Sequence, residues 1–119
     1  MARHGSLVRR GLGPGLLVVI LTALGCASVK DIPAVDGPVA AAAESSGASI
    51  ASVSHGHDLY VHNCNRCHPY KLPASRSKEE WAGILPRMTK RAGLNEVEAA
   101  DVRAFVFAAR DASEREQTK

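Results

Sequence analysis

The sequence predicts an all-α fold, with three helices in the second half of a chain of 119 residues. Two helix starts are marked by capping residues, because Ser77 is followed three residues later by Glu80, and Asn95 by Glu98. Apolar side chains recur at helical spacing between residues 102 and 109. No segment alternates apolar and polar residues as a strand would, so we expect no sheet.

We expect the first helix at about residues 55–63, with Ser54 as its N-cap. The second begins at Ser77, where a capping box satisfies free N–H groups, and Gly93 is a natural stop. The third begins after Asn95 and ends near residue 112, and residues 113–119 form a disordered polar tail. The folded domain is therefore predicted over residues 54–112.

Residues 1–25 have the composition of a signal peptide. Three arginines and no acidic residue lie in the first ten positions, and a short apolar run follows over residues 12–25. This order is typical of an export signal. A membrane-spanning helix needs about 20 apolar residues, whereas this run is shorter and contains Pro14. We therefore expect a signal peptide rather than an uncleaved anchor.

Cys26 ends the apolar run and follows Ala23-Leu24-Gly25. This stretch resembles the lipobox of bacterial lipoproteins, in which a diacylated cysteine becomes the new N-terminus. The alternative is that Cys26 is discarded with a signal cut by the ordinary signal peptidase. Because Ala27 follows the cysteine, the resemblance implies sorting to the outer membrane. We expect a lipid anchor on Cys26 at the periplasmic side of a bacterial membrane, or else a soluble periplasmic protein.

Residues 26–53 are rich in Ala, Ser, Gly and Pro and carry no sustained period of large apolar residues. This composition predicts a disordered, flexible linker between the lipid anchor and the domain. A linker of this length would have a root-mean-square span of about 30 Å.

The segment Cys64-Asn65-Arg66-Cys67-His68 is the strongest motif in the chain. C-x-x-C-H is the pattern of covalent haem attachment, in which two thiols add to vinyl groups and the histidine ligates the iron. With two Phe, one Trp and two Tyr in the whole chain, the domain has few large side chains for its core. A covalent haem would supply the missing apolar surface.

The segment from Gly56 to His68 resembles the opening helix of small class I c-type cytochromes, which carry one haem. That helix has Gly, an aromatic residue four positions later, and C-x-x-C-H after three more, as at Gly56, Tyr60 and Cys64. The last helix of the family has an aliphatic, an aromatic and an aliphatic residue, which residues 102–106 match. The resemblance covers residues 54–112. It implies a cytochrome c-like fold in which Gly56 lets the last helix cross closely.

The same resemblance implies that His68 is the proximal iron ligand and that a proline-associated carbonyl, at Pro69 or Pro73, orients it. Met88 is our candidate for the sixth ligand because Pro86-Arg87-Met88 is similar to the distal segment of such cytochromes. Met88 also ends a helical stripe with Trp81, Ile84 and Leu85, which is equally the pattern of plain core. Pro86 is expected to distort the helix just before it.

Three further histidines, His55, His57 and His62, precede the motif. They are either exposed residues on a helix face or ligands of a bis-histidine or second metal site. Two other functions stay open. The protein could be a five-coordinate haem sensor or ligand-binding protein in which Met88 is only core. It could also be a haem-free zinc or dithiol module built on Cys64 and Cys67.

Charge excludes one class of partner. Three of the 15 Lys and Arg residues lie in the signal, which leaves 12 against 12 acids, so we expect no nucleic-acid partner. No carboxylate pair, phosphate loop or nucleophile–base arrangement predicts an enzyme or a small-molecule substrate. Basic residues concentrate before the last helix, where they either attract acidic redox proteins or form an ordinary solvated surface. The resemblance implies an electron carrier that exchanges one electron with such partners.

Overall fold

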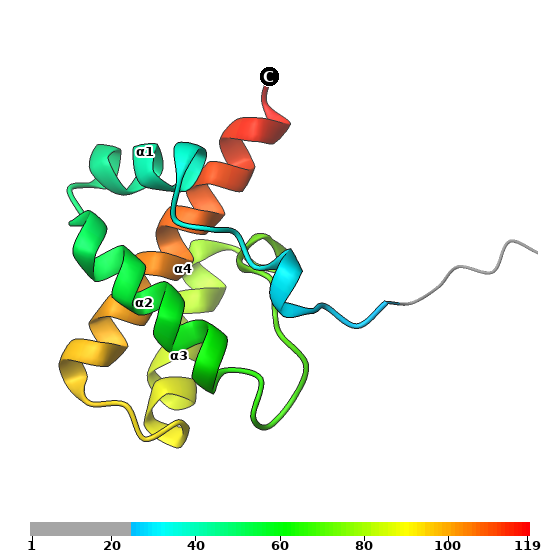
Figure 1. Ribbon diagram of the computed structural model, residues 1–119, viewed down its shortest axis with the longest axis vertical. Coiled ribbons are helices and arrows are strands. Elements are labelled where there is room, and N and C mark those ends of the chain that lie inside the picture. The colour runs from blue at the N-terminus through cyan, green and yellow to red at the C-terminus, as the bar shows by residue number, and fades with distance from the viewer. Residues whose placement is uncertain (1–24) are drawn as a thin grey trace, which may run out of the picture.

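The computed structural model describes residues 25–119, which are helical without strands, and this confirms the predicted all-α class (Figure 1). The signal-peptide prediction lies outside this range except at Gly25. The described part of the chain has four α-helices and two short 3₁₀ turns, against the three helices predicted. Their bounds are η1 Val29–Asp31, α1 Gly37–Ser46, α2 Ile50–Asn63, η2 Pro73–Ser75, α3 Lys78–Arg91 and α4 Glu96–Gln117.

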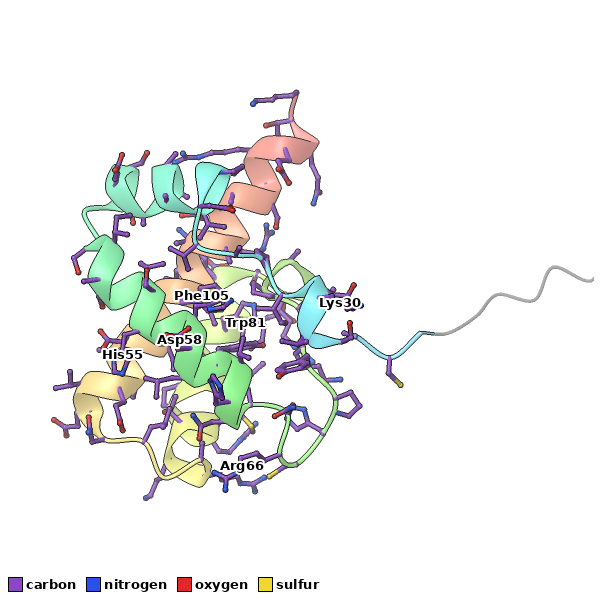
Figure 2. The ribbon with its side chains drawn as sticks, in the orientation of Figure 1. Lys30, His55, Asp58, Arg66, Trp81 and Phe105 are labelled. Carbon is purple, nitrogen blue, oxygen red and sulfur yellow. The ribbon has the colours of Figure 1, made fainter. Side chains whose placement is uncertain are left out.

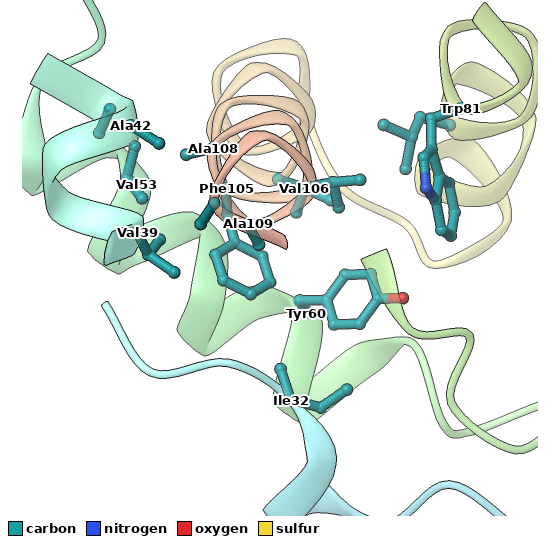
Figure 3. Packing of buried hydrophobic residues seen from close by; sticks show 14 of the residues in the cluster. Ile32, Val39, Ala42, Val53, Tyr60, Trp81, Phe105, Val106, Ala108 and Ala109 are labelled. Atoms are coloured by element: carbon teal, nitrogen blue, oxygen red, sulfur yellow. The ribbon is translucent and has the colours of Figure 1, made fainter. Parts of the chain in front are cut away.

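Helix α4 is the element around which the others pack, because α1, α2 and α3 all contact it (Figure 1). Its buried face carries Val102, Phe105 and Val106, all with no exposed surface. The cluster that these residues join is shown in Figure 3. None of the helices among the described residues combines the length and apolar character needed to cross a bilayer.

Close approach of α2 to α4 depends on Gly56. A Cβ atom at this position would lie 1.9 Å from the backbone oxygen of Asp101 and 2.4 Å from its carbonyl carbon. The expected close crossing at Gly56 is therefore confirmed. Beside the crossing, Ser52 and His55 both hydrogen-bond the Asp101 carboxylate, the latter through Nδ1 at 2.7 Å.

The segment 26–53, predicted from its composition to be a disordered linker, is mostly folded. Ten of its residues form α1, which begins after Asp36 and is followed by Gly47 in the left-handed conformation, with φ of 75°. Ala42 and Ala43 are fully buried and belong to the same core cluster as Ala108 and Ala109 of α4. Alanine is the best helix former, and its small side chain lets two helices pack closely without large apolar residues. The composition argument failed because it counted only large side chains.

Two further bounds differ from the prediction. Helix α2 begins at Ile50, and its N-cap is Ser49 rather than Ser54, because Ser49 Oγ accepts a hydrogen bond from the Ser52 N–H at 3.0 Å. Helix α4 continues to Gln117, so most of the predicted tail is helical. Within the extension, the Arg115 guanidinium donates to the Ser45 hydroxyl of α1 at 3.4 Å.

The predicted capping boxes are confirmed at both helix starts. The Ser77 side chain accepts from the Glu80 N–H at 3.2 Å, and the Glu80 carboxylate accepts from the Ser77 N–H at 2.8 Å. Asn95 and Glu98 make the same reciprocal pair. Gly93 follows the end of α3 with φ of 75°, as its predicted stop requires.

Candidate functional site

The candidate site is a cavity of about 270 Å³ between the loop that follows α2 and one face of α3. The loop leaves α2 at Cys64, whose N–H donates to the Tyr60 carbonyl at 3.0 Å. The four residues singled out from the sequence all line this cavity, and we call them the donor set: Cys64, Cys67, His68 and Met88.

The two motif thiols differ in environment. Cys64 is half-buried and burial raises its pKa to about 11, whereas Cys67 is exposed. Both are free thiols, as is the exposed Cys26. A pair of reduced thiols at one cavity is what addition to two vinyl groups would require.

The imidazole of His68 is oriented by its own neighbour. Its Nδ1 lies 2.8 Å from the Pro69 carbonyl oxygen. A carbonyl can only accept, so Nδ1 carries the proton, and in the neutral imidazole Nε2 has a free lone pair. Of the two proline carbonyls considered from the sequence, Pro69 is the one that bonds His68. A histidine fixed through Nδ1 is the usual arrangement for a ligand that binds metal through Nε2.

Three hydrogen bonds donated by aromatic side chains hold the loop in place. The Tyr60 hydroxyl donates to the Lys71 carbonyl, and the Tyr70 hydroxyl donates to the Val61 carbonyl at 2.5 Å. The Trp81 indole N–H donates to the Pro73 carbonyl at 2.9 Å. Burial raises the pKa of Tyr60, which keeps its hydroxyl protonated and able to donate.

The two tyrosine rings also stack on each other, with centroids 6.3 Å apart. Sequence reasoning missed Tyr70, which fixes the chain two residues after His68. The available signal was a lone aromatic residue in a loop otherwise rich in polar residues and proline.

Helix α3 supplies the apolar wall. Trp81 and Leu85 are 3% and 4% exposed, and with Ile84 and Met88 they line the cavity, so the stripe faces the site. Pro86 lies inside the helix, which continues to Arg91. Thr89 hydroxyl donates to the Leu85 carbonyl at 2.9 Å, within the turn that contains Pro86.

The remaining cavity residues are mainly basic. Lys71, Arg76, Arg87 and Arg91 line it, and no Asp or Glu of the described residues does. Arg76 is held at 3.6 Å from the Glu80 carboxylate. An anionic group bound in the cavity would therefore meet cations and no carboxylate.

The other histidines lie away from the donor set. His55 bonds Asp101, and His62 Nδ1 donates to the Asp58 carbonyl at 2.7 Å. His57 packs edge-on against Phe105, with ring centroids 5.1 Å apart. None of the three lines the cavity. Over residues 25–119, no group of three or more His, Cys, Asp or Glu side chains is arranged to hold a metal ion.

Comparisons of the chain with family models, with curated proteins and with solved structures found no match.

Proposed function

We propose that this chain is a one-electron carrier, a monohaem c-type cytochrome held at a membrane. The observation that supports it most directly is the meeting of two distant segments. The C-x-x-C-H loop and Met88, which lies 20 residues beyond His68, line the same cavity. The C-x-x-C-H motif by itself does not require Met88 to lie near it.

The residues present fit a covalently bound haem. Cys64 and Cys67 would form the thioether bonds, and the free Nε2 of His68 would ligate the iron, with the thioether of Met88 as the sixth ligand. A haem bound there supplies an iron centre that alternates between the ferric and ferrous states. The Pro69 carbonyl holds the His68 ring in one orientation, so the ligand need not rearrange between the two states.

The apolar wall would tune the centre. Trp81 and Leu85 limit water on the α3 side, and a dry pocket disfavours the additional positive charge of ferric iron. The soft sulfur of Met88 favours the ferrous state. Both effects raise the reduction potential, which suits a relay late in a respiratory or other extracytoplasmic redox chain. No small-molecule substrate is required.

Optical spectroscopy tests this proposal. The protein is expressed with an export signal in a host that attaches haem, and spectra are recorded in the oxidised and reduced states. We expect covalent c-type bands that persist after extraction with acidified acetone.

Cys64→Ser and Cys67→Ser should each leave one thioether and shift the α-band of the pyridine haemochrome. Cys26→Ser is the matched control and should leave the spectrum unchanged. Colourless protein, or pigment lost to the solvent, would contradict the proposal.

The proposed location rests on Cys26, which is exposed and free at the start of the described chain. We propose that it carries a lipid on the periplasmic side of a bacterial membrane, the outer membrane in an organism with two. Labelling with an alkyne fatty acid tests this, because Cys26→Ser should abolish the label and release the haem protein from membranes. Undiminished label in that variant would contradict it.

A further inference from the structure

A second hollow in the surface lies between α3 and the start of α4, and we call it the α3/α4 groove. Its volume is about 280 Å³. Ala82, Leu85 and Pro86 line it from α3, and Ala99 and Ala100 line it from α4. Of these residues, Leu85 alone also lines the cavity of the donor set. The groove is therefore a separate surface of the molecule.

The α3/α4 groove is turned away from the core. Phe105 of α4 and Trp81 of α3 lie in the interior of the molecule, 0% and 3% exposed (Figure 2). Ala82 and Ala100, on other faces of the same two helices, are exposed. Val97 lies one turn before Ala100 and is 71% exposed, more than any other large apolar side chain of residues 25–119. Apolar surface is thus open to solvent along this side of α4.

Two oppositely charged side chains also line the groove. Glu96 and Arg103 are both exposed. Within residues 25–119 neither forms an ion pair, and the Arg103 guanidinium lies 4.9 Å from the centroid of the Phe107 ring. Glu96 and Arg103 are separated by about two helical turns, so they project from the same side of α4. Both charges are therefore available to a partner on that side.

The spacing of these charges is self-complementary. The midpoint between positions 96 and 103 falls between Ala99 and Ala100. A two-fold axis through that point would set two copies of α4 antiparallel, with Glu96 of each copy opposite Arg103 of the other. Alanine at the crossing lets two helices approach closely, because the distance between packed helices depends on the side chains at the contact. Each copy of α4 would then lie in the groove beside α3 of the other.

We propose that the α3/α4 groove is a self-association surface, through which two copies of this chain form a two-fold symmetric dimer. A different protein could also offer opposite charges, but charges placed symmetrically about an alanine pair match a second copy of the same helix. The inference goes beyond the proposed electron-carrier function and does not depend on it. Because the groove and the cavity of the donor set share only Leu85, the cavity would stay accessible in the dimer.

Sedimentation equilibrium of the full chain as exported tests the proposal, in a density-matched detergent where the chain is purified from membranes. We expect the wild type to show a concentration-dependent equilibrium between monomer and dimer. Glu96→Arg and Arg103→Glu should each raise the apparent Kd of the dimer by at least about tenfold, because each change sets like charges against each other at both contacts. Glu44→Arg is the matched control, since Glu44 is an exposed residue of α1, and this variant should associate like the wild type.

Mixing the two single variants gives the sharpest measurement. In a pair of one Glu96→Arg chain and one Arg103→Glu chain, both contacts across the axis again join opposite charges. The mixture should therefore dimerise, although each variant alone does so weakly. A chain that carries both substitutions should likewise regain the wild-type Kd. Mixing cannot repair a folding defect, so recovery in the mixture reports on the surface itself.

Three results would overturn the inference. A wild-type chain that stays monomeric up to about 1 mM would show that the groove does not bind a second copy. Equal weakening by Glu44→Arg would assign the association to net charge. A dimer that Glu96→Arg and Arg103→Glu leave unchanged, or a mixture of the two that stays monomeric, would place the contact on another face.

Discussion

Gly56 offers a sharp test of how α2 and α4 pack. In Gly56→Ala the new Cβ would lie 1.9 Å from the Asp101 backbone oxygen, which is more than an ångström closer than real Cβ contacts allow. Because the atom met is backbone, no side-chain rotation can relieve the overlap, and the two helices must separate. We expect the free energy of unfolding to fall by about 3 kcal/mol, the upper end of the usual cost of overpacking.

For a domain of this size that loss corresponds to a decrease in Tm of about 12–24 °C. Thermal unfolding followed by far-ultraviolet circular dichroism measures it. Gly83→Ala is the matched control, because Gly83 lies inside α3 with no atom within 4 Å of an added Cβ. It should raise stability by about 0.5–1 kcal/mol, since alanine is the better helix former. A decrease of less than about 1 kcal/mol for Gly56→Ala would refute the close crossing.

Three further predictions concern the site and its surroundings. Met88→Ala should lower the midpoint potential and allow the ferrous protein to bind carbon monoxide, whereas ready binding by the wild type would support a five-coordinate sensor. Hydrogen bonds from Ser52 and His55 lower the pKa of Asp101 from 3.8. The ionised carboxylate of Asp101 therefore stabilises the fold above about pH 3.8. The Tm difference between the wild type and Asp101→Asn should shrink as the pH is lowered below that value, because the carboxylate becomes protonated. In haem-free protein at about pH 8, iodoacetamide should modify Cys67 before Cys64, because burial raises the pKa of the Cys64 thiol to about 11. Peptide mass spectrometry measures the rate at each cysteine, and the two rates should become similar as the pH approaches about 11.

The features that the sequence predicted correctly are local or specific to one residue. The capping boxes at Ser77 and Asn95 depend on groups only three residues apart. The close crossing at Gly56 was implied by the resemblance stated for residues 56–68, and glycine is the one residue without the Cβ atom that would prevent it. Such features can be recognised in the sequence without knowledge of the rest of the fold.

The predictions that failed required knowledge of distant partners. Helix α1 is stabilised by contact with α4, which begins 50 residues after α1 ends, so its alanine run was misread as a linker. The end of α4 was placed too early for the same reason, because Arg115 near its end bonds Ser45 of α1. Tyr70 was missed since its bond to the Val61 carbonyl exists only once the loop has folded back. The roles assigned to the donor set stay predictions, although its members line one cavity.

The packing of Ile32 determines how freely the domain could move on a lipid anchor. Ile32 is 6% exposed and belongs to the core, and Ala27, directly after Cys26, also packs against that core. No free tether therefore separates Cys26 from the folded part of the chain. A domain acylated at Cys26 would thus stay close to the lipid headgroups of the membrane. A haem bound to a domain anchored in this way would exchange electrons with proteins embedded in, or resting on, the same bilayer.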